Sequence, residues 1–453
     1  MTISNPASSA IRDLTRHLMG KQGYALVDQL MVSGSNFLTG VAIARSIGLQ
    51  GFGVFTLLWT AVLFLYSTQI ALIVSPMMSI GPKESEDEVA GYYGCVLSHG
   101  AVFAVVGSAM LFLLMLCSAW LVPRWGVRPL ALPLAAASGC YLMQDLMRRY
   151  FYCTWRAGAA LINDVVSYLG QLALLLLAWR YAHSDCALVL WITAITSFAA
   201  ILLGVAMLGP VRISYGKLRR VATRHWISSK WLLGSNLLQW AGGSVFYVSA
   251  PAYLGVAAVG AMRAAQSLLN VTNIWFQSLE NVIPSEAARR LHHGGVGAML
   301  RYLRQVALRW GGLTLVFAIA VAVFANPLMR FIYGSAFQGY GYVIRWMAFI
   351  CIVTVITVSP VAGLRAIEKT RPIFYANIVS TLLAFLLSVP IVKVFALRGA
   401  VGGILLCRVA LLAVLEVSFR VGVAATKAEE DGRVASAGED SIAAKDAPFS
   451  LPL

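Results

Sequence analysis

Charged residues are scarce in this sequence. Asp, Glu, Lys and Arg together make up 12% of its 453 residues, whereas an ordinary soluble domain contains about 25%. Hydrophobic residues make up 59% of the chain, and its mean hydropathy is +0.76. A water-soluble globule could not cover its surface with so few polar groups. The composition therefore excludes an ordinary soluble domain and predicts an all-α polytopic membrane protein.

The sequence also lacks the usual motifs of catalysis and metal binding. Its seven cysteines show no CxxC and no Cys/His spacing of the kind that binds zinc. Its six histidines form no metal motif. No Walker loop is present, so we expect no ATP hydrolysis by this chain. We predict that the protein is not an enzyme and that it holds no metal and no cofactor.

Negative charge is rarer than positive charge. The chain has 35 Lys and Arg against 19 Asp and Glu, a net charge of +16. Such an excess can serve nucleic-acid binding, but membrane proteins also concentrate Lys and Arg in their cytoplasmic loops. The membrane interpretation explains the charge without a nucleic acid, and we expect no nucleic-acid partner.

Long apolar runs are abundant. A membrane span needs roughly 20 apolar residues, and we find about twelve such segments. They cover residues 24–47, 52–79, 92–121, 128–150, 158–181, 187–208, 230–254, 257–286, 306–331, 340–364, 372–394 and 399–421. The connections alternate between many and few Lys and Arg, which predicts cytoplasmic N- and C-termini.

The longest connection, residues 209–229, divides the spans into two groups of six. We expect an N-terminal lobe at 24–208 and a C-terminal lobe at 230–421. Residues 1–23 are predicted to be a cytoplasmic or interfacial segment, and residues 422–453 a disordered cytoplasmic tail, because they lack apolar periodicity. The connection itself is predicted to be a cytoplasmic linker near anionic lipid headgroups, since it contains Arg212, Lys217, Arg219, Arg220 and Arg224.

A short glycine-containing stretch occurs once in each half. Gly48 and Gly53 correspond to Gly255 and Gly260 at an offset of 207 positions. Internal repeats of about half the chain length are typical of secondary transporters. We expect the first stretch to form a tight outer turn between two spans.

The predicted eighth span carries polar residues at every third or fourth position. They are Arg263, Gln266, Asn270, Asn273, Gln277 and Glu280. In a helix these side chains share one face. Single polar residues in spans often only join helices by hydrogen bonds, but six on one face favour the wall of a water-filled cavity.

Arginines in the spans carry information about the substrate. Arg45 lies near the outer end of the first span, and Arg408 either faces the cavity or pairs with another helix. A guanidinium binds phosphate or carboxylate in a forked geometry, so these arginines and Arg263 favour an anionic substrate. The acidic residues of the spans either pair with arginines or bind a coupling ion; they are Asp28, Asp164 and Glu280.

Three further charges lie at the cytoplasmic end of the predicted fourth span. Asp145 precedes Arg148 and Arg149 by three and four residues. This spacing places them on one side of a helix and predicts local ion pairs.

Two stretches carry a family resemblance. Residues 42–55 read AIARSIGLQGFGVF, and residues 256–268 read VAAVGAMRAAQSL, without an aromatic residue after Val259. Both resemble the polysaccharide flippases of the multidrug/oligosaccharidyl-lipid/polysaccharide (MOP) exporter superfamily. The resemblance implies a MATE-like bundle of two pseudo-symmetric six-helix lobes around a central cavity.

The same resemblance implies a function. Flippases of this kind transfer undecaprenyl-pyrophosphate-linked oligosaccharides across the inner membrane by alternating access, in exopolysaccharide, O-antigen or capsule biosynthesis. The implied partners are the lipid-linked oligosaccharide, membrane lipids and other polysaccharide assembly proteins. Two alternatives stay open: a multidrug-type cation antiporter of the same fold, and a membrane enzyme or assembly subunit of glycan biosynthesis.

Overall fold

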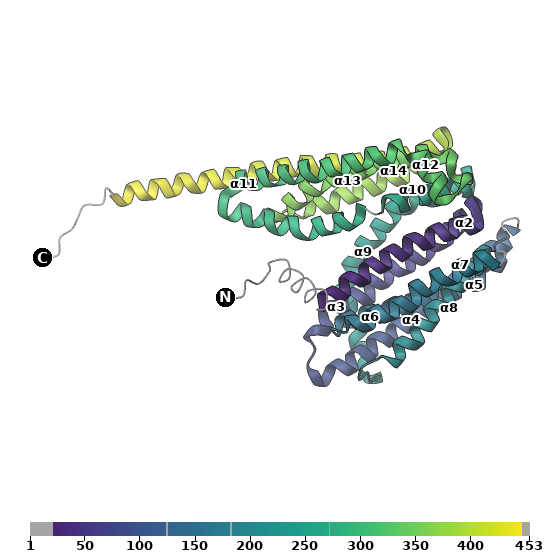
Figure 1. The fold of residues 1–453 in the computed structure, drawn as a ribbon. Helices are drawn as coiled ribbons and strands as arrows, with labels where there is room; N and C mark the ends of the chain where they lie inside the picture. The colour runs from purple at the N-terminus through teal and green to yellow at the C-terminus, as the bar shows by residue number, and fades with distance from the viewer. Residues whose placement is uncertain (1–20, 124–125, 182–183, 271, 446–453) are drawn as a thin grey trace, which may run out of the picture. The chain divides into compact units, whose positions relative to one another are not determined.

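The computed structural model describes residues 21–123, 126–181, 184–270 and 272–445. Within these helices, the side chains of residues 21–26, 273–275, 277–282, 429 and 431–445 lie outside the description. Every regular element of the described residues is a helix, as the composition predicts. Two compact units are formed, one from Met1–Ser267 with Met329–Gln338 and one from Leu268–Leu328 with Gly339–Leu453 (Figure 1).

The first unit begins with one long, kinked helix. Helix α2 (Lys21–Gln69) contains the first predicted span and most of the second. Between them Gly48 has φ 70° and ψ −179°, a conformation that glycine adopts without a steric penalty. The chain continues through the π-helical η1 (Ile70–Val74), α3 (Ser75–Ile80) and the 3₁₀ turn η2 (Gly81–Lys83).

The remaining helices of this unit follow in the predicted order. They are α4 (Glu86–Leu121), the short η4 (Arg128–Leu130), α5 (Ala131–Cys153), α6 (Ala157–Asp164), the π-helical η5 (Val165–Leu169), α7 (Gly170–Tyr181), α8 (Cys186–Ala206), α9 (Tyr215–Leu254) and α10 (Val256–Leu269). The last residues of α10 belong to the second unit.

Helix α5 lies at the centre of the first unit, where it contacts α4, α8, α6 and α2. One apolar core includes Met77 and Phe151, and another includes Val62, Leu142 and Leu190. Helix α4 exposes an apolar face that includes Val102, Val105, Val106, Leu113 and Leu114. Exposed apolar faces of this extent fit contact with lipid chains rather than with water.

The second unit consists of α11 (Thr272–Val323), the start of α12 (Ala325–Tyr333), α13 (Gly341–Ala366) and α14 (Arg371–Lys445). Helix α13 packs between α11 and α14, around a core that includes Met299, Leu364 and Phe419. The 3₁₀ helix η6 (Ser335–Tyr340) lies before α13, and most of it belongs to the first unit. Chain bends occur at Gly295 (φ 67°) and Ala396 (φ 52°).

Seven helical stretches of the described chain are long and apolar enough to cross a membrane. Two of them, Val27–Lys83 and Arg371–Ala428, are 57 and 58 residues long and each covers two predicted spans. Helix α5 falls outside the seven because it contains Asp145, Arg148 and Arg149. The helices therefore agree with a polytopic protein of about twelve spans, each needing roughly 20 residues.

Three boundaries differ from the predicted ones. The compact units divide the chain after Ser267, not at the predicted linker 209–229, since α9 and α10 pack with the first unit. Most of that linker is helical, because α9 starts at Tyr215. Helix α14 continues to Lys445, where a disordered tail was predicted; its many Ala, Glu and Lys residues have high helix propensity. Residues 1–20, which include the predicted interfacial segment, lie outside the described residues.

Candidate functional site

A buried ion cluster lies at the centre of the first unit. The Arg148 guanidinium on α5 lies 2.9 Å from the Asp28 carboxylate on α2 and 2.5 Å from the Asp164 carboxylate on α6. Asp28 and Asp164 are fully buried, and Arg148 is 8% exposed. Buried charges are stable only when they are paired and hydrogen-bonded. Arg148 therefore joins α5 and α6, which are neighbours in sequence, to the distant α2.

Neutral polar groups complete the cluster. Gln144 Nε2 donates to Asp164 Oδ1 at 2.9 Å and to Asn163 Oδ1 at 3.1 Å. The Tyr152 hydroxyl donates to Asp28 Oδ2. Gln144, Arg148 and Tyr152 are spaced four residues apart, so one face of α5 supplies them all. Asp28 Oδ1 and Gln144 Oε1 are buried and have no hydrogen-bond partner among the described residues.

A second pair lies beside the first cluster on α5. Arg149 Nε lies 3.4 Å from Asp145 Oδ2, and its terminal nitrogen donates to the Tyr66 hydroxyl at 2.9 Å. Arg148 reaches the other Asp145 oxygen at 4.0 Å. The predicted local pairs are thus confirmed. When all groups are ionised, three carboxylates face two guanidiniums, so the cluster lacks one positive charge.

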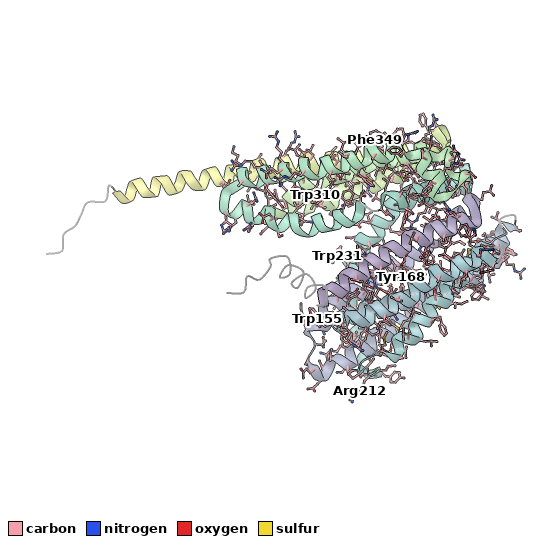
Figure 2. All side chains as sticks on the ribbon, viewed as in Figure 1. Trp155, Tyr168, Arg212, Trp231, Trp310 and Phe349 are labelled. Atoms are coloured by element: carbon pink, nitrogen blue, oxygen red, sulfur yellow. The ribbon has the colours of Figure 1, made fainter. Side chains whose placement is uncertain are left out.

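Two π-helical segments interrupt the helices around this cluster. Segment η5 begins directly after Asp164 and contains the buried Tyr168 (Figure 2). Segment η1 begins directly after Gln69, whose side-chain amide donates to the Leu142 carbonyl of α5 at 3.1 Å. Single-turn π-helical segments within α-helices occur frequently at functional sites. The wider π-helical turn changes the direction in which the residues after Asp164 and after Gln69 point around the helix axis.

The repeated glycine stretches cross each other in the first unit. A Cβ on Gly53 would lie 1.9 Å from the Val256 carbonyl oxygen, and one on Gly260 would lie 2.5 Å from the Leu49 carbonyl oxygen. Leu49 and Val256 are also 207 positions apart, so the contact is reciprocal. Gly255 has φ 77°, close to the 70° of Gly48. The internal repeat predicted from the sequence is therefore confirmed in the backbone.

Arg45 lies beside this crossing. Its Nε donates to the Ile332 carbonyl at 2.7 Å, and a terminal nitrogen donates to the Phe331 carbonyl. These carbonyls belong to the last turn of α12, where the helix itself supplies no amide that could donate to them. A cation at this end also interacts favourably with the helix dipole. Phe52 packs against Tyr333 on the same segment, with ring centroids 6.5 Å apart. Contact of Arg45 with substrate stays a prediction.

The start of the predicted polar stripe lies on α10. Arg263 and Gln266 are half-buried and joined by a hydrogen bond of 3.2 Å, and the Tyr247 hydroxyl donates to the same Gln266 oxygen at 3.0 Å. Asn270, just after α10, is exposed. The side chains that continue the stripe on α11 lie outside the described residues; they are Asn273, Gln277 and Glu280.

Arg408 lies within α14 of the second unit. Its side chain is exposed and forms no ion pair among the described residues. It lies inside the 58-residue apolar stretch Arg371–Ala428. A charge in such a stretch normally faces water or a partner, because transfer to lipid is unfavourable.

The structure thus gives different environments to the predicted site residues. Asp28 and Asp164 meet at Arg148, for which the sequence predicts only a local pair. Arg45, Arg263 and Arg408 form no ion pair with a carboxylate among the described side chains. The sequence signal for the cluster was the spacing of Gln144, Arg148 and Tyr152, but it does not indicate which helices lie opposite.

Comparison with solved structures identifies the fold. An inward-facing multidrug resistance MATE family transporter of the MOP superfamily matches with a TM-score of 0.69 and 13% identity, over 87% of this chain and 94% of that chain. Lipid II flippase MurJ, in an inward closed conformation, matches with a TM-score of 0.62 and 10% identity, over 87% of each chain. An MOP superfamily transporter from Pyrococcus furiosus, described as having a binding pocket of reverse polarity, matches with a TM-score of 0.54 and 14% identity, over 90% and 98%.

No family model and no curated protein matches the sequence itself. The likeness is therefore one of structure across nearly the whole chain. This protein has the all-helical fold that MATE transporters share with the MurJ flippase, as predicted.

Proposed function

We propose that this protein transfers undecaprenyl-pyrophosphate-linked oligosaccharide units across the inner membrane by alternating access. The observation that carries the proposal is the difference in accessibility between the positive and negative side chains of the predicted site that the structure describes. Asp28 and Asp164 are fully buried on Arg148, whereas Arg408 is exposed and Arg263 is half-buried, with no carboxylate partner among the described residues.

This difference favours an anionic substrate. Accessible arginines bind pyrophosphate through forked hydrogen bonds, while a carrier of organic cations needs accessible carboxylates. Arg408 lies in an apolar helix, where a charge normally faces a water-filled opening or a partner, and a bound anion would serve as that partner. The fold shared with a lipid II flippase supports a lipid-linked substrate whose tail remains in the bilayer.

The ion cluster supplies a means of coupling to a proton gradient. Three carboxylates and two guanidiniums in a buried site favour the binding of one proton, since a buried unpaired charge is strongly unfavourable. Binding of that proton at Asp28 or Asp164 would weaken one contact to Arg148 and alter the packing of α2, α5 and α6. Glu280, the third predicted coupling residue, is not needed for this step.

The test is a transfer assay in sealed proteoliposomes with a fluorescent undecaprenyl-pyrophosphate oligosaccharide. We expect transfer by the parent protein and strongly reduced transfer by Arg408→Gln and Arg263→Gln. The matched control is Arg128→Gln, an exposed arginine at a predicted outer turn. Parent-like transfer by both test variants, at equal protein content, would remove these arginines from the mechanism.

A second candidate is a multidrug-type cation antiporter, which the TM-score of 0.69 to a MATE family transporter favours. The same vesicles distinguish the two functions. Proton-driven uptake of ethidium, abolished by Asp28→Asn and accompanied by no transfer of lipid-linked saccharide, would establish the antiporter and refute the flippase.

A further inference from the structure

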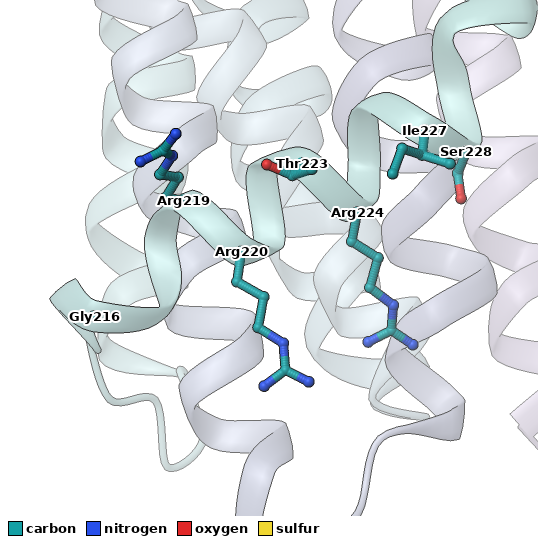
Figure 3. A pocket seen from close by; sticks show the side chains of 7 residues that line it. All are labelled: Gly216, Arg219, Arg220, Thr223, Arg224, Ile227 and Ser228. Carbon is teal, nitrogen blue, oxygen red and sulfur yellow. The ribbon is translucent and has the colours of Figure 1, made fainter.

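The first part of α9 has a concave surface lined with arginine. This shallow, open surface, the linker shelf, is formed by Gly216, Arg219, Arg220, Thr223, Arg224, Ile227 and Ser228 and borders about 690 Å³ of space, room for several polar atoms of a ligand headgroup. Figure 3 shows Arg220 and Arg224 extending side by side from the same face of the helix. Their spacing of four residues produces this alignment.

The inner face of the same helix is held firmly against the first unit. Val221 is buried in the apolar core with Tyr92 and Tyr93, and His225 Nε2 lies 2.9 Å from the Tyr92 hydroxyl. Just before α9, the chain crosses α4 so closely that a Cβ on Gly94 would lie 2.1 Å from the Arg212 carbonyl oxygen. The outward direction of the linker shelf is therefore determined by packing.

The positive charge of this shelf is only partly neutralised. Arg224 pairs with Glu84, and Lys217 lies 3.0 Å from Glu88. Arg219 and Arg220 are exposed and form no ion pair with any described carboxylate. Arg220 is thus free to bind an anion on the face that it shares with Arg224, a further hydrogen-bond donor, while Arg219 projects from another side of the helix (Figure 3).

Exposed aromatic and aliphatic side chains lie next to these arginines. Trp226 and Ile227 are 54% and 64% exposed, and Tyr215 and Trp231 are about four-fifths exposed. Trp and Tyr collect at membrane–water interfaces, where an apolar ring meets polar headgroups. Basic and apolar groups alternate along this helix, as in helices that lie at a bilayer surface.

We propose that the linker shelf binds the headgroup of an anionic membrane phospholipid. Arg220 binds its phosphate with Arg224 beside it, Arg219 adds positive charge near the headgroup, and Trp226 and Ile227 contact the start of its acyl chains. Charge complementarity with the negatively charged leaflet favours this occupant. The proposal goes beyond substrate transfer and holds whatever molecule the protein transports.

Native mass spectrometry of the full-length protein in neutral detergent tests this binding, with phosphatidylglycerol as the probe and phosphatidylcholine for comparison. We expect phosphatidylglycerol to bind more tightly, and Arg219→Gln/Arg220→Gln to weaken that binding by roughly 30-fold, at about 1 kcal/mol per arginine. The Arg219→Lys/Arg220→Lys variant should retain most of the affinity, because Lys and Arg are attracted to an anionic headgroup by the same charge.

The control variant is Arg128→Gln/Arg180→Gln, which removes two exposed charges elsewhere in the first unit and should change the affinity less than about two-fold. A photoactivatable phosphatidylglycerol should label peptides within residues 215–231. If both Gln double variants weakened phosphatidylglycerol binding equally, the effect would depend on net charge alone, and the proposed site would be overturned. Labelling of the shelf by undecaprenyl diphosphate but not by phosphatidylglycerol would assign it to the transported lipid instead.

Discussion

Replacement of Arg148 by methionine tests the ion cluster most directly. The substitution preserves much of the side-chain volume but leaves the fully buried carboxylates of Asp28 and Asp164 without the guanidinium that lies 2.9 and 2.5 Å from them. Removal of one partner from a buried pair costs about 3–5 kcal/mol. At roughly 2–4 °C per kcal/mol for a unit of 150–250 residues, the apparent Tm should fall on the order of 10 °C.

A triple variant separates charge from packing. Arg148→Met combined with Asp28→Asn and Asp164→Asn contains no charge at the three positions, so it should recover at least half of the lost stability. The assay is thermal unfolding in detergent at pH 7, followed by intrinsic fluorescence. Arg128→Met, at an exposed position, provides the control.

Two results would refute this reasoning. A single Arg148→Met variant that loses less than about 2 °C would show that the buried carboxylates accept the loss of their partner, through protonation or water. A triple variant no more stable than the single one would show that Arg148 acts through its shape and not its charge.

The other predictions concern the glycine crossing and the helix of the linker shelf. Gly53→Ala places a Cβ 1.9 Å from the Val256 carbonyl, where an ordinary contact needs 3.4 Å, so we expect a loss of about 1–3 kcal/mol from overpacking. Gly40→Ala has no atom within 4 Å and should be neutral or stabilising; equal Tm values for the two variants would contradict the crossing. Burial lowers the pKa of His225 to about 4, whereas the unfolded chain binds this proton near pH 6.5. The contribution of His225 to stability should therefore rise between pH 4 and 6.5 and remain constant at higher pH. In thermal unfolding at pH 4.5, 5.5 and 7.5, His225→Gln should show a smaller rise of Tm with pH than the parent protein. Parallel Tm curves for the two proteins would contradict this prediction.

Much of the fold could be predicted from the sequence because the signals are local. Runs of about 20 apolar residues predict membrane helices wherever they occur, and the helices of the first unit follow the predicted order. The glycine repeat could also be predicted, because Gly48 and Gly255 are visible in the sequence and adopt backbone angles that other residues avoid. Helix α14 extends beyond residue 422 to Lys445, a stretch whose Ala, Glu and Lys residues have high helix propensity although it lacks apolar periodicity.

The candidate site was only partly predictable. Asp28 and Asp164 were recognised as charges that need a partner. The sequence predicts a helical pair of Arg148 with Asp145, which the structure contains, but the main partners of Arg148 are 120 and 16 positions away. The spacing of residues within one helix indicates which side chains share a face, and it contains no information about the face opposite.

The sequence by itself determined the class of protein, the approximate spans and the two-fold repeat, because hydropathy and glycine conformation depend on nearby residues alone. The tertiary structure decided which charges are neutralised and which remain accessible. Asp28, Arg148 and Asp164 neutralise one another only because α2, α5 and α6 pack together. Arg45 donates to a carbonyl at the end of α12 that is 287 residues away in the sequence. Electrostatic energy depends on distances of a few ångströms between groups, and only packing brings residues so far apart in the chain to such distances.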